Sequence, residues 1–259
     1  MSPTSSQPIS QIEDIVAGYR VLAAHGIIDA YGHVSVRSQF DPETYLLARS
    51  VAPEIVTADD IITYDLESNP LDANGRDSVK ERFIHGEIYK ARPDVTSVVH
   101  NHSPTVVPFS VTGIQLRPLF HMAAFIGQGV PLFEIRDFAR DTDLLVSNPT
   151  LGARLATVLG DAPAALMRGH GAVGVGENIA RSIGRSVYLE LSAKMQLQAM
   201  ALAWPSGEIN WLDEGEVRAS APVQDYYRAW PMWRDKALAG LKSARGASKG
   251  KKAKGKSRK

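Results

Sequence analysis

The sequence predicts one α/β domain in which helices flank a mainly antiparallel or mixed sheet. The chain has 259 residues, enough for one large domain, and its 44% apolar and 22% charged content is ordinary for a globular protein. Segments with helical spacing of apolar residues and short strand-like segments both occur along the chain. They mix without the regular strand–helix alternation of a doubly wound fold, which argues against an all-parallel sheet.

The N-terminal quarter of the chain predicts a helix followed by three short strands. Apolar residues recur at helical spacing over residues 9–25, and Gly26 provides the stop. "HVSVRS" and "TYLLARS" have the composition of short strands. Thr57 precedes two aspartates, which predicts a capped turn that leads into a strand over residues 61–65.

The middle of the chain predicts a second helix and then a buried strand. "SVKERFIHGEIYKARPD" fits a helix over residues 79–91, which the proline after Arg92 closes. "SVVHNH" follows as an apolar strand. A helix-like segment is expected after Pro104, and another apolar strand around residues 130–135.

The last third predicts two helices around a glycine-rich strand region. "NPTLGARLATVLG" is helical, with Gly160 as its stop. "AALMRGHGAVGVG" has strand character. The longest helix is expected over residues 178–203.

The N-terminal sequence, the hydropathy and the absence of cysteine indicate the cellular compartment in which the protein is expected. The start, "MSPTSSQPIS", lacks the basic and apolar regions of a signal peptide, and no apolar run approaches the length of a membrane span. Cysteine is absent, which excludes disulfides, thiolate metal ligands and a cysteine nucleophile. We therefore expect a cytoplasmic protein with no membrane partner.

The charge is unevenly distributed. Residues 242–259 hold nine Lys or Arg and no acid, so the rest of the chain has a net charge of −8, although the total is +1. We expect residues 1–241 to form the single domain and residues 242–259 to be a disordered basic tail. No aromatic residues interleave the tail charges, so nucleic acid is expected to make only non-specific tail contacts.

Two histidines in "SVVHNHSP" lie two residues apart on a predicted strand. Alternation sends residues i and i+2 to one face, so His100 and His102 point the same way. On this stretch alone, two readings stay open: two separate hydrogen-bonded core contacts, or two ligands of one divalent metal.

A third histidine and a carboxylate complete a potential ligand set. His170 lies between two glycines in "RGHGAVG", which leaves room for a ligand or for close backbone approach. The same glycines match a dinucleotide fingerprint, but the motif comes late and lacks a strand–helix–strand context, so we do not favour it. Glu81, alternatively a simple helix N-terminal carboxylate, could join His100, His102 and His170 around Zn, Mn, Fe or Co.

Taken together, "ERFIHGEIYKARPDVTSVVHNHSP" and the later "LMRGHGAVGVG" resemble the class II aldolase/adducin family over about residues 10 to 215. The resemblance implies a three-layer αβα sandwich and a homotetramer with active sites at subunit interfaces. It also implies that His100, His102 and His170 hold a divalent metal and that Glu81 is an acid–base carboxylate that can also ligate it.

Departures from the sugar-phosphate aldolases in this family favour a different branch. His33 of "GHVSVR" stands where those aldolases have asparagine, and "LARSVAPEIV" replaces their phosphate-binding loop. His121-Met122 replaces their His-Tyr pair. The variant motifs resemble decarboxylases of ortho-hydroxy aromatic or pyridine carboxylates and dicarboxylates, which implies a small-molecule substrate and a role in aromatic compound catabolism.

The expected chemistry uses the metal as an electron sink when CO2 leaves. Glu81 is predicted to be the proton donor, with a pKa raised by burial, and His121 to be a second catalytic residue. An acidic substrate needs cationic or polar partners, and we expect these to be Arg49, Ser50, His33 and Arg117.

Two alternatives remain at this stage. The same residues fit an aldolase or epimerase acting on a hydroxy-acid or sugar-derived substrate. A non-catalytic, adducin-like interaction protein is the other alternative, although a pure scaffold has no need for three histidines and a glutamate in this order.

Overall fold

The computed structural model describes residues 8–127 and 129–239, which fold around a single seven-stranded sheet. The strand order is β3-β2-β1-β4-β7-β6-β5. All neighbouring strands are antiparallel except β5 and β6, which are parallel. The predicted mixed sheet is therefore confirmed. The predicted basic tail, residues 242–259, lies outside the described residues.

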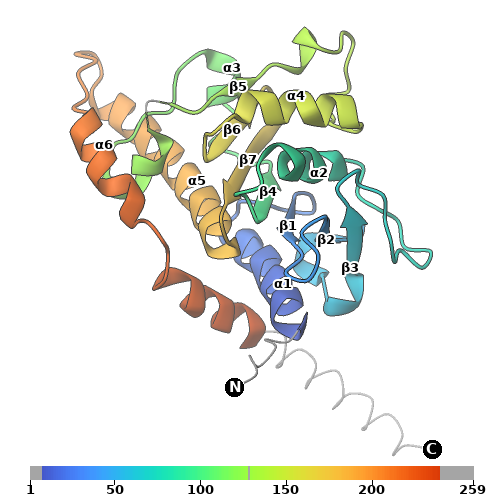
Figure 1. Cartoon of the computed structure of the whole chain (residues 1–259). Coiled ribbons are helices and arrows are strands. Elements are labelled where there is room, and N and C mark those ends of the chain that lie inside the picture. Colours follow the sequence, from blue (N-terminus) through green and yellow to red (C-terminus); the bar gives the residue numbers. More distant parts are fainter. Residues whose placement is uncertain (1–7, 128, 240–259) are drawn as a thin grey trace, which may run out of the picture.

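Figure 1 shows these strands and the helices around them. The strands are β1 (His33–Arg37), β2 (Thr44–Ala48), β3 (Ile61–Asp65), β4 (Ser97–Asn101), β5 (Leu132–Phe133), β6 (Ala164–Met167) and β7 (Gly171–Gly176). The labelled α-helices are α1 (Pro8–Ala24), α2 (Arg82–Ala91), α3 (Phe109–Thr112), α4 (Pro149–Leu159), α5 (Ile179–Leu202) and α6 (Glu214–Ser220). Residues 229–239 are also helical. The 3-10 turns are η1 (Pro53–Ile55), η2 (Ala58–Asp60), η3 (His121–Ile126), η4 (Ile135–Asp137) and η5 (Ala221–Val223).

Helices cover both faces of the sheet. Helices α2 and α4 pack against one face, where Ile84, Ile88 and Leu155 join Val98 and Val173 of the strands in one core cluster. Helices α1 and α5 pack against the other face, where their apolar residues form a second cluster with strands β1 and β4. The chain is thus a three-layer αβα sandwich, as expected.

Most predicted elements are present, with three differences in length. The helix expected over residues 79–91 begins only at Arg82, and Glu81, the residue before it, directs its side chain into a cluster described below. The helix expected after Pro104 is limited to α3, since a second proline, Pro108, precedes it and Gly113 ends it at φ +72°. The strand expected over residues 130–135 shortens to two residues.

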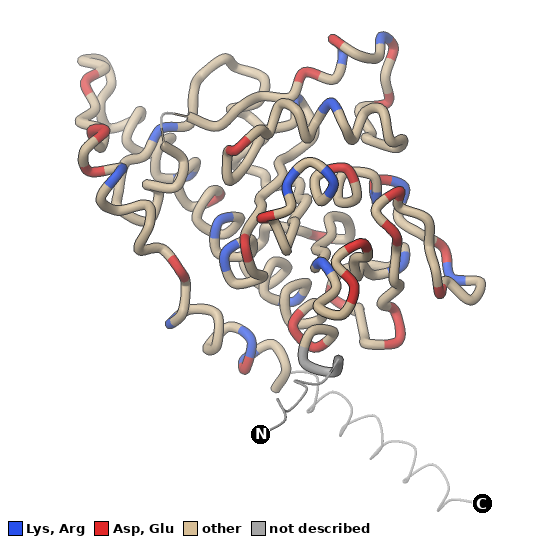
Figure 2. The backbone as a smooth tube through the Cα atoms, in the orientation of Figure 1, with Lys and Arg blue, Asp and Glu red and all other residues tan. Residues whose placement is uncertain are grey.

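Charges of both signs are interspersed along the described chain (Figure 2). Among the described residues, no helix is long and apolar enough to cross a membrane.

Candidate metal centre

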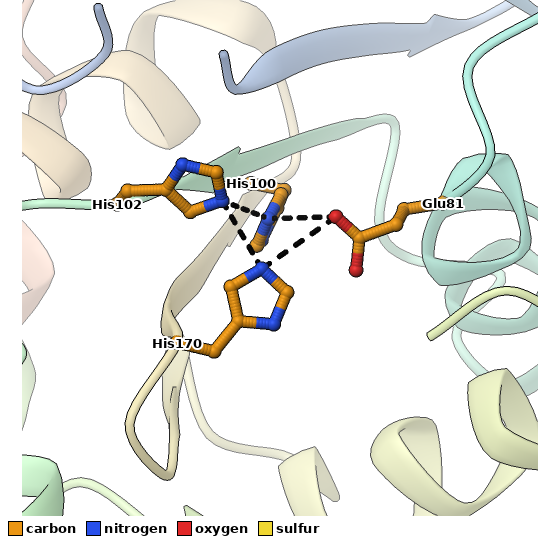
Figure 3. A group of neighbouring side chains, drawn as sticks. All are labelled: Glu81, His100, His102 and His170. Atoms are coloured by element: carbon orange, nitrogen blue, oxygen red, sulfur yellow. Dashed lines mark hydrogen bonds and ion pairs between the residues drawn. The ribbon is translucent and has the colours of Figure 1, made fainter. Parts of the chain in front are cut away.

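Three histidines and a glutamate from distant parts of the sequence converge at one edge of the central strands (Figure 3). Glu81 immediately precedes α2, His100 lies in β4, and His102 follows the last residue of β4. His170 lies in the turn between β6 and β7. Since β4 and β7 are paired neighbours, the sheet itself brings this turn beside the histidines of β4.

The four ligand atoms are close enough to share one ion. The Nε2 atom of His102 is 3.2 Å from Nε2 of His100 and 3.1 Å from Nε2 of His170. Oε2 of Glu81 is 3.5 Å from Nε2 of both His100 and His170. All four atoms lie within 4.8 Å of one another. The rings of His100 and His102 therefore face one point. This favours the reading in which both are ligands of one divalent metal over the reading in which they make separate core contacts.

These separations fit a divalent ion. With metal–nitrogen bonds of about 2.1 Å, adjacent ligand atoms of a tetrahedral site lie about 3.4 Å apart. Imidazole and carboxylate donors suit Zn, Mn, Fe or Co. Three ring nitrogens that face each other without an ion would leave lone pairs opposed, whereas one cation satisfies them together. The donor set therefore fits the metal that the sequence predicts.

The glycines beside His170 serve the backbone geometry of this turn. Gly169 has φ +63°, a left-handed conformation that favours glycine. At Gly171, an added Cβ would lie 1.9 Å from the carbonyl oxygen of Asn101, so only glycine lets β7 approach β4 here. Close backbone approach, one of the two uses expected for these glycines, is what the structure shows.

A segment that the sequence did not mark orients two members of the cluster. The backbone N–H of Val146 donates to Oε1 of Glu81 at 3.0 Å, which leaves Oε2 to face the histidines. Nδ1 of His170 lies 2.9 Å from the carbonyl oxygen of Leu144 and donates to it, so Nε2 keeps its lone pair for the cluster. Leu144 adopts φ +68°, a strained conformation for leucine that presents this carbonyl.

Electrostatic coupling within the cluster sets the charge states. Burial raises the pKa of Glu81, but the charge and hydrogen bonds of His100 and His170 outweigh it and hold that pKa well below its usual range. Burial thus acts on the Glu81 pKa in the expected direction, but the two histidines reverse the net shift. Burial and the two neighbouring histidines lower the pKa of His102 to about 4. Burial lowers the pKa of His170, but Glu81 more than offsets this and raises it overall.

A second row of polar groups lies behind the cluster. His33 is the register partner of His100 across β1 and β4, and the two rings are 5.0 Å apart. Nδ1 of His33 lies 2.6 Å from Nε2 of His85 on α2. The fully buried His85 is thus a hydrogen-bonded helix histidine and is not in the metal cluster, which includes Glu81, His100, His102 and His170. Burial and then the His100 ring lower the pKa of His85 to about 3.

A cavity of about 560 Å³ opens beside the cluster, within the size range of small-molecule sites. Its lining includes the predicted residues His33, Ser50, Glu81 and His102. The remaining lining residues are Ala30, Tyr31, Gly32, Val51, Ala52, Val79, Lys80 and Leu145. The "LARSVAPEIV" loop therefore does face the cavity, through Ser50 and the two residues after it.

Three predicted residues are placed elsewhere within this chain. Nε of Arg49 donates to Oδ1 of Asp60 at 2.6 Å, and Arg49 is not among the residues that line the cavity. The guanidinium of Arg117 lies 4.6 Å over the Trp211 ring, beside a different cavity. His121 begins η3, is exposed, and accepts a hydrogen bond at its carbonyl from Gln224.

Sequence reasoning also missed contributors to this site. Lys80 is the only lysine or arginine among the described residues that line the cavity. Its position next to Glu81 in the sequence could have indicated that it lies near the site. Leu144 and Val146 act through backbone groups, which every residue type carries, so no side-chain pattern could have marked them.

Comparison with known proteins agrees with this geometry. The Class II Aldolase and Adducin N-terminal domain matches residues 13–197. The decarboxylase tropJ of Talaromyces stipitatus is 35% identical over 245 residues, which cover 86% of this chain and 92% of that protein. The 3,4-dihydroxyphthalate decarboxylase of Arthrobacter keyseri is 28% identical over 237 residues, covering 86% and 90%. The structure of L-fuculose 1-phosphate aldolase from Glaciozyma antarctica superposes with a TM-score of 0.73 at 23% identity, covering 95% and 96% of the two chains, and shares the fold.

Proposed function

Because the chain belongs to the class II aldolase and adducin family, in the branch whose curated relatives are decarboxylases, we propose that it is a divalent-metal-dependent carboxy-lyase. The proposed substrate is an ortho-hydroxy aromatic or pyridine carboxylate or dicarboxylate. The observation that carries the proposal is the convergence of three histidine Nε2 atoms and one carboxylate oxygen beside a cavity.

His100, His102 and His170 would hold the ion through Nε2, with Glu81 Oε2 as the fourth protein ligand or a close neighbour. A bound divalent cation supplies Lewis-acid stabilisation of the negative charge that develops on the substrate oxygen as the C–C bond breaks. Leu144 and Val146 keep the orientation of His170 and Glu81 through their backbone groups.

Glu81 is proposed to move the proton. Oε2 of Glu81 faces the cluster, so its carboxylate would first accept the proton of a substrate hydroxyl bound there. When CO2 leaves, the same oxygen returns that proton to the ring carbon. Glu81 would thus act as the proton donor, as predicted, after it has received that proton from the substrate hydroxyl.

Three residues of the cavity are proposed to bind the substrate. His33 and Ser50 line it and offer hydrogen-bonding side chains. Lys80 supplies a positive charge at the same wall and takes the place that the sequence assigned to Arg49, whose guanidinium is bound to Asp60. A carboxylate that remains on the ring is the group that Lys80 would attract.

His121 and Arg117 stay in the proposal as contributions from a neighbouring subunit. Within one chain they do not line the cavity beside the cluster. The expected homotetramer with interface active sites would allow both to approach a cavity on another copy. His121 would then complete the catalytic group and Arg117 would face the substrate.

One panel of assays tests the proposal. Purified protein is loaded with Mn, Zn, Fe or Co and incubated with hydroxyphthalates, pyridine dicarboxylates and sugar phosphates, while CO2 and aldehyde release are both measured. CO2 release from the aromatic acids supports the decarboxylase. Aldehyde release would instead identify an aldolase, and the absence of a stoichiometric metal with no turnover would favour a scaffold.

A further inference from the structure

Four buried polar side chains form an unbroken hydrogen-bonded chain behind the metal centre. His33 Nδ1 lies 2.6 Å from His85 Nε2, and His85 Nδ1 lies 2.6 Å from Ser35 Oγ. Ser35 Oγ lies 2.7 Å from the hydroxyl of Tyr89. Ser35, His85 and Tyr89 are at most 1% exposed, so water does not reach this chain from their side.

The end at Tyr89 sets the direction of the chain. Among the described residues, Ser35 is the only side chain that hydrogen-bonds to the Tyr89 hydroxyl. The backbone of Val98 also bonds to this hydroxyl and lowers its pKa, as a donating N–H does, so it does not take up the phenol proton. If Ser35 donated to Tyr89, the phenol proton would be buried without a side-chain acceptor, which is costly. Tyr89 therefore donates to Ser35, and Ser35 donates to Nδ1 of His85.

This direction passes through His85 to His33. With Nδ1 of His85 acting as an acceptor, its proton lies on Nε2 and is donated to Nδ1 of His33. A neutral His33 ring then carries its own proton on Nε2. The chain thus selects one of the two tautomers of His33.

The selected N–H is available to a ligand. His33 lines the cavity beside the cluster. Its Nε2 has no hydrogen-bond partner among the described residues, and it is not sealed off from solvent as the unpartnered Nδ1 of His100 is. Nε2 of His33 is therefore open to the cavity, where it can only donate.

We propose that His33 is a preset hydrogen-bond donor for an anionic oxygen of the substrate, and that His85, Ser35 and Tyr89 are positioning residues that hold its tautomer. This inference rests on the proposed function, because it specifies how the aromatic acid is recognised. A carboxylate or phenolate oxygen only accepts hydrogen bonds, so a preset donor favours it over groups that must donate.

Salicylate binding to the metal-loaded protein, measured by calorimetry, tests the proposal without turnover. Tyr89→Phe removes the terminal donor and should weaken salicylate binding about fivefold to tenfold, the worth of about one net hydrogen bond. His33→Asn carries amide donors that need no relay. In that background Tyr89→Phe should change binding by less than about twofold.

Tyr45→Phe is the matched control, since Tyr45 is another fully buried tyrosine that stacks on His85 but bonds to Ser68 instead of the relay. It should leave salicylate binding unchanged. An equal effect of Tyr89→Phe in both backgrounds, or no salicylate binding to the wild type, would overturn the relay, while CO2 release still decides the proposed function separately.

The tautomer can also be read directly in the unmodified protein, so the proposal does not depend on folding of the variants. In zinc-loaded protein with ¹⁵N-labelled histidine, NMR should place the His33 proton on Nε2. A proton on Nδ1 would overturn the proposed direction. In the Tyr89→Phe protein the His33 signals should shift toward a mixture of both tautomers.

Discussion

The metal cluster and His121 of η3 were both predicted to contribute to catalysis, but only the cluster residues lie together within one chain. Glu81, His100, His102 and His170 meet within 4.8 Å inside one chain. His121, in η3, is exposed and is absent from the lining of the cavity beside the cluster. The cluster depends on the pairing of β4 with β7, whereas η3 packs against α5 and α6.

The difference shows that side-chain positions are easier to predict on a regular strand than in an irregular segment. Strand register converts a sequence spacing into a fixed direction, so the two histidines around β4 had to share a face. No comparable rule fixes where an irregular segment such as η3 presents a side chain. A role of His121 in the reaction therefore depends on the proposed subunit interface, since His121 does not line the cavity within one chain.

The largest expected effect comes from breaking the cluster itself. His170→Asn removes one ring nitrogen from a turn whose backbone is already set by glycine, so the fold should survive. Losing a metal ligand should weaken metal binding by more than about a hundredfold, since even partners of ligands cost tenfold to a hundredfold. Elemental analysis after dialysis measures this. His121→Asn should keep its metal, and loss of metal from both variants would erase the contrast between the two regions.

Glu81→Gln should have the next largest effect. The amide cannot carry a proton to the ring carbon, so CO2 release should fall about a hundredfold to ten-thousandfold, while metal content stays largely intact. Glu87→Gln is the matched control, because Glu87 is also a buried glutamate of this helix region but pairs with Lys90 at 2.7 Å. Full activity of Glu81→Gln would remove Glu81 from the proton transfer.

Much of this site was visible in the sequence for physical reasons. The spacing of His100 and His102 and the left-handed backbone at Gly169 record constraints that act locally, and Gly171 marks a close approach to β4. Helix ends were also predictable, as Asn178 and Gly160 show at the start of α5 and the end of α4. The backbone groups of Leu144 and Val146 were not, because an N–H or a carbonyl has no residue signature.

Arginines were harder to place than histidines. A guanidinium on a long side chain can reach several acceptors, and its choice depends on tertiary neighbours that the sequence does not order. Arg49 lies in the loop predicted to bind substrate, but its guanidinium pairs with Asp60. The guanidinium of Arg117 stacks on the Trp211 ring. The loop does lie beside the cavity, through Ser50, Val51 and Ala52, whereas the side chain of Arg49 does not line it.

Subunit complementation sharpens the comparison between the two regions. Glu81→Gln and His121→Ala should each be impaired alone. If every site takes Glu81 from one subunit and His121 from another, randomly mixed oligomers of the two variants regain about a quarter of the wild-type sites. Activity measured after co-refolding at equal amounts should rise to that level. No recovery over the separate variants would mean that His121 does not act across an interface.

The smallest effect is expected at Arg49, which lies in the predicted substrate loop but has a structural partner. Oδ2 of Asp60 accepts from the N–H and the hydroxyl of Thr57, each at 2.8 Å, and Oδ1 accepts from Arg49. Arg49→Gln should lower the free energy of unfolding by at most about 1 kcal/mol and leave CO2 release nearly unchanged.

Acid should abolish the structural contribution of Asp60 itself. Burial raises its pKa, but the Thr57 hydrogen bonds and Arg49 outweigh this and lower it below its usual value. Its contribution is therefore complete above the unfolded pKa of about 3.9 and is lost as the pH falls through the lower folded value. In urea unfolding, Asp60→Asn should cost about 1 kcal/mol at pH 7 and progressively less below pH about 4. An Arg49→Gln protein with unchanged stability but a tenfold higher KM for a dicarboxylate would return Arg49 to the substrate site.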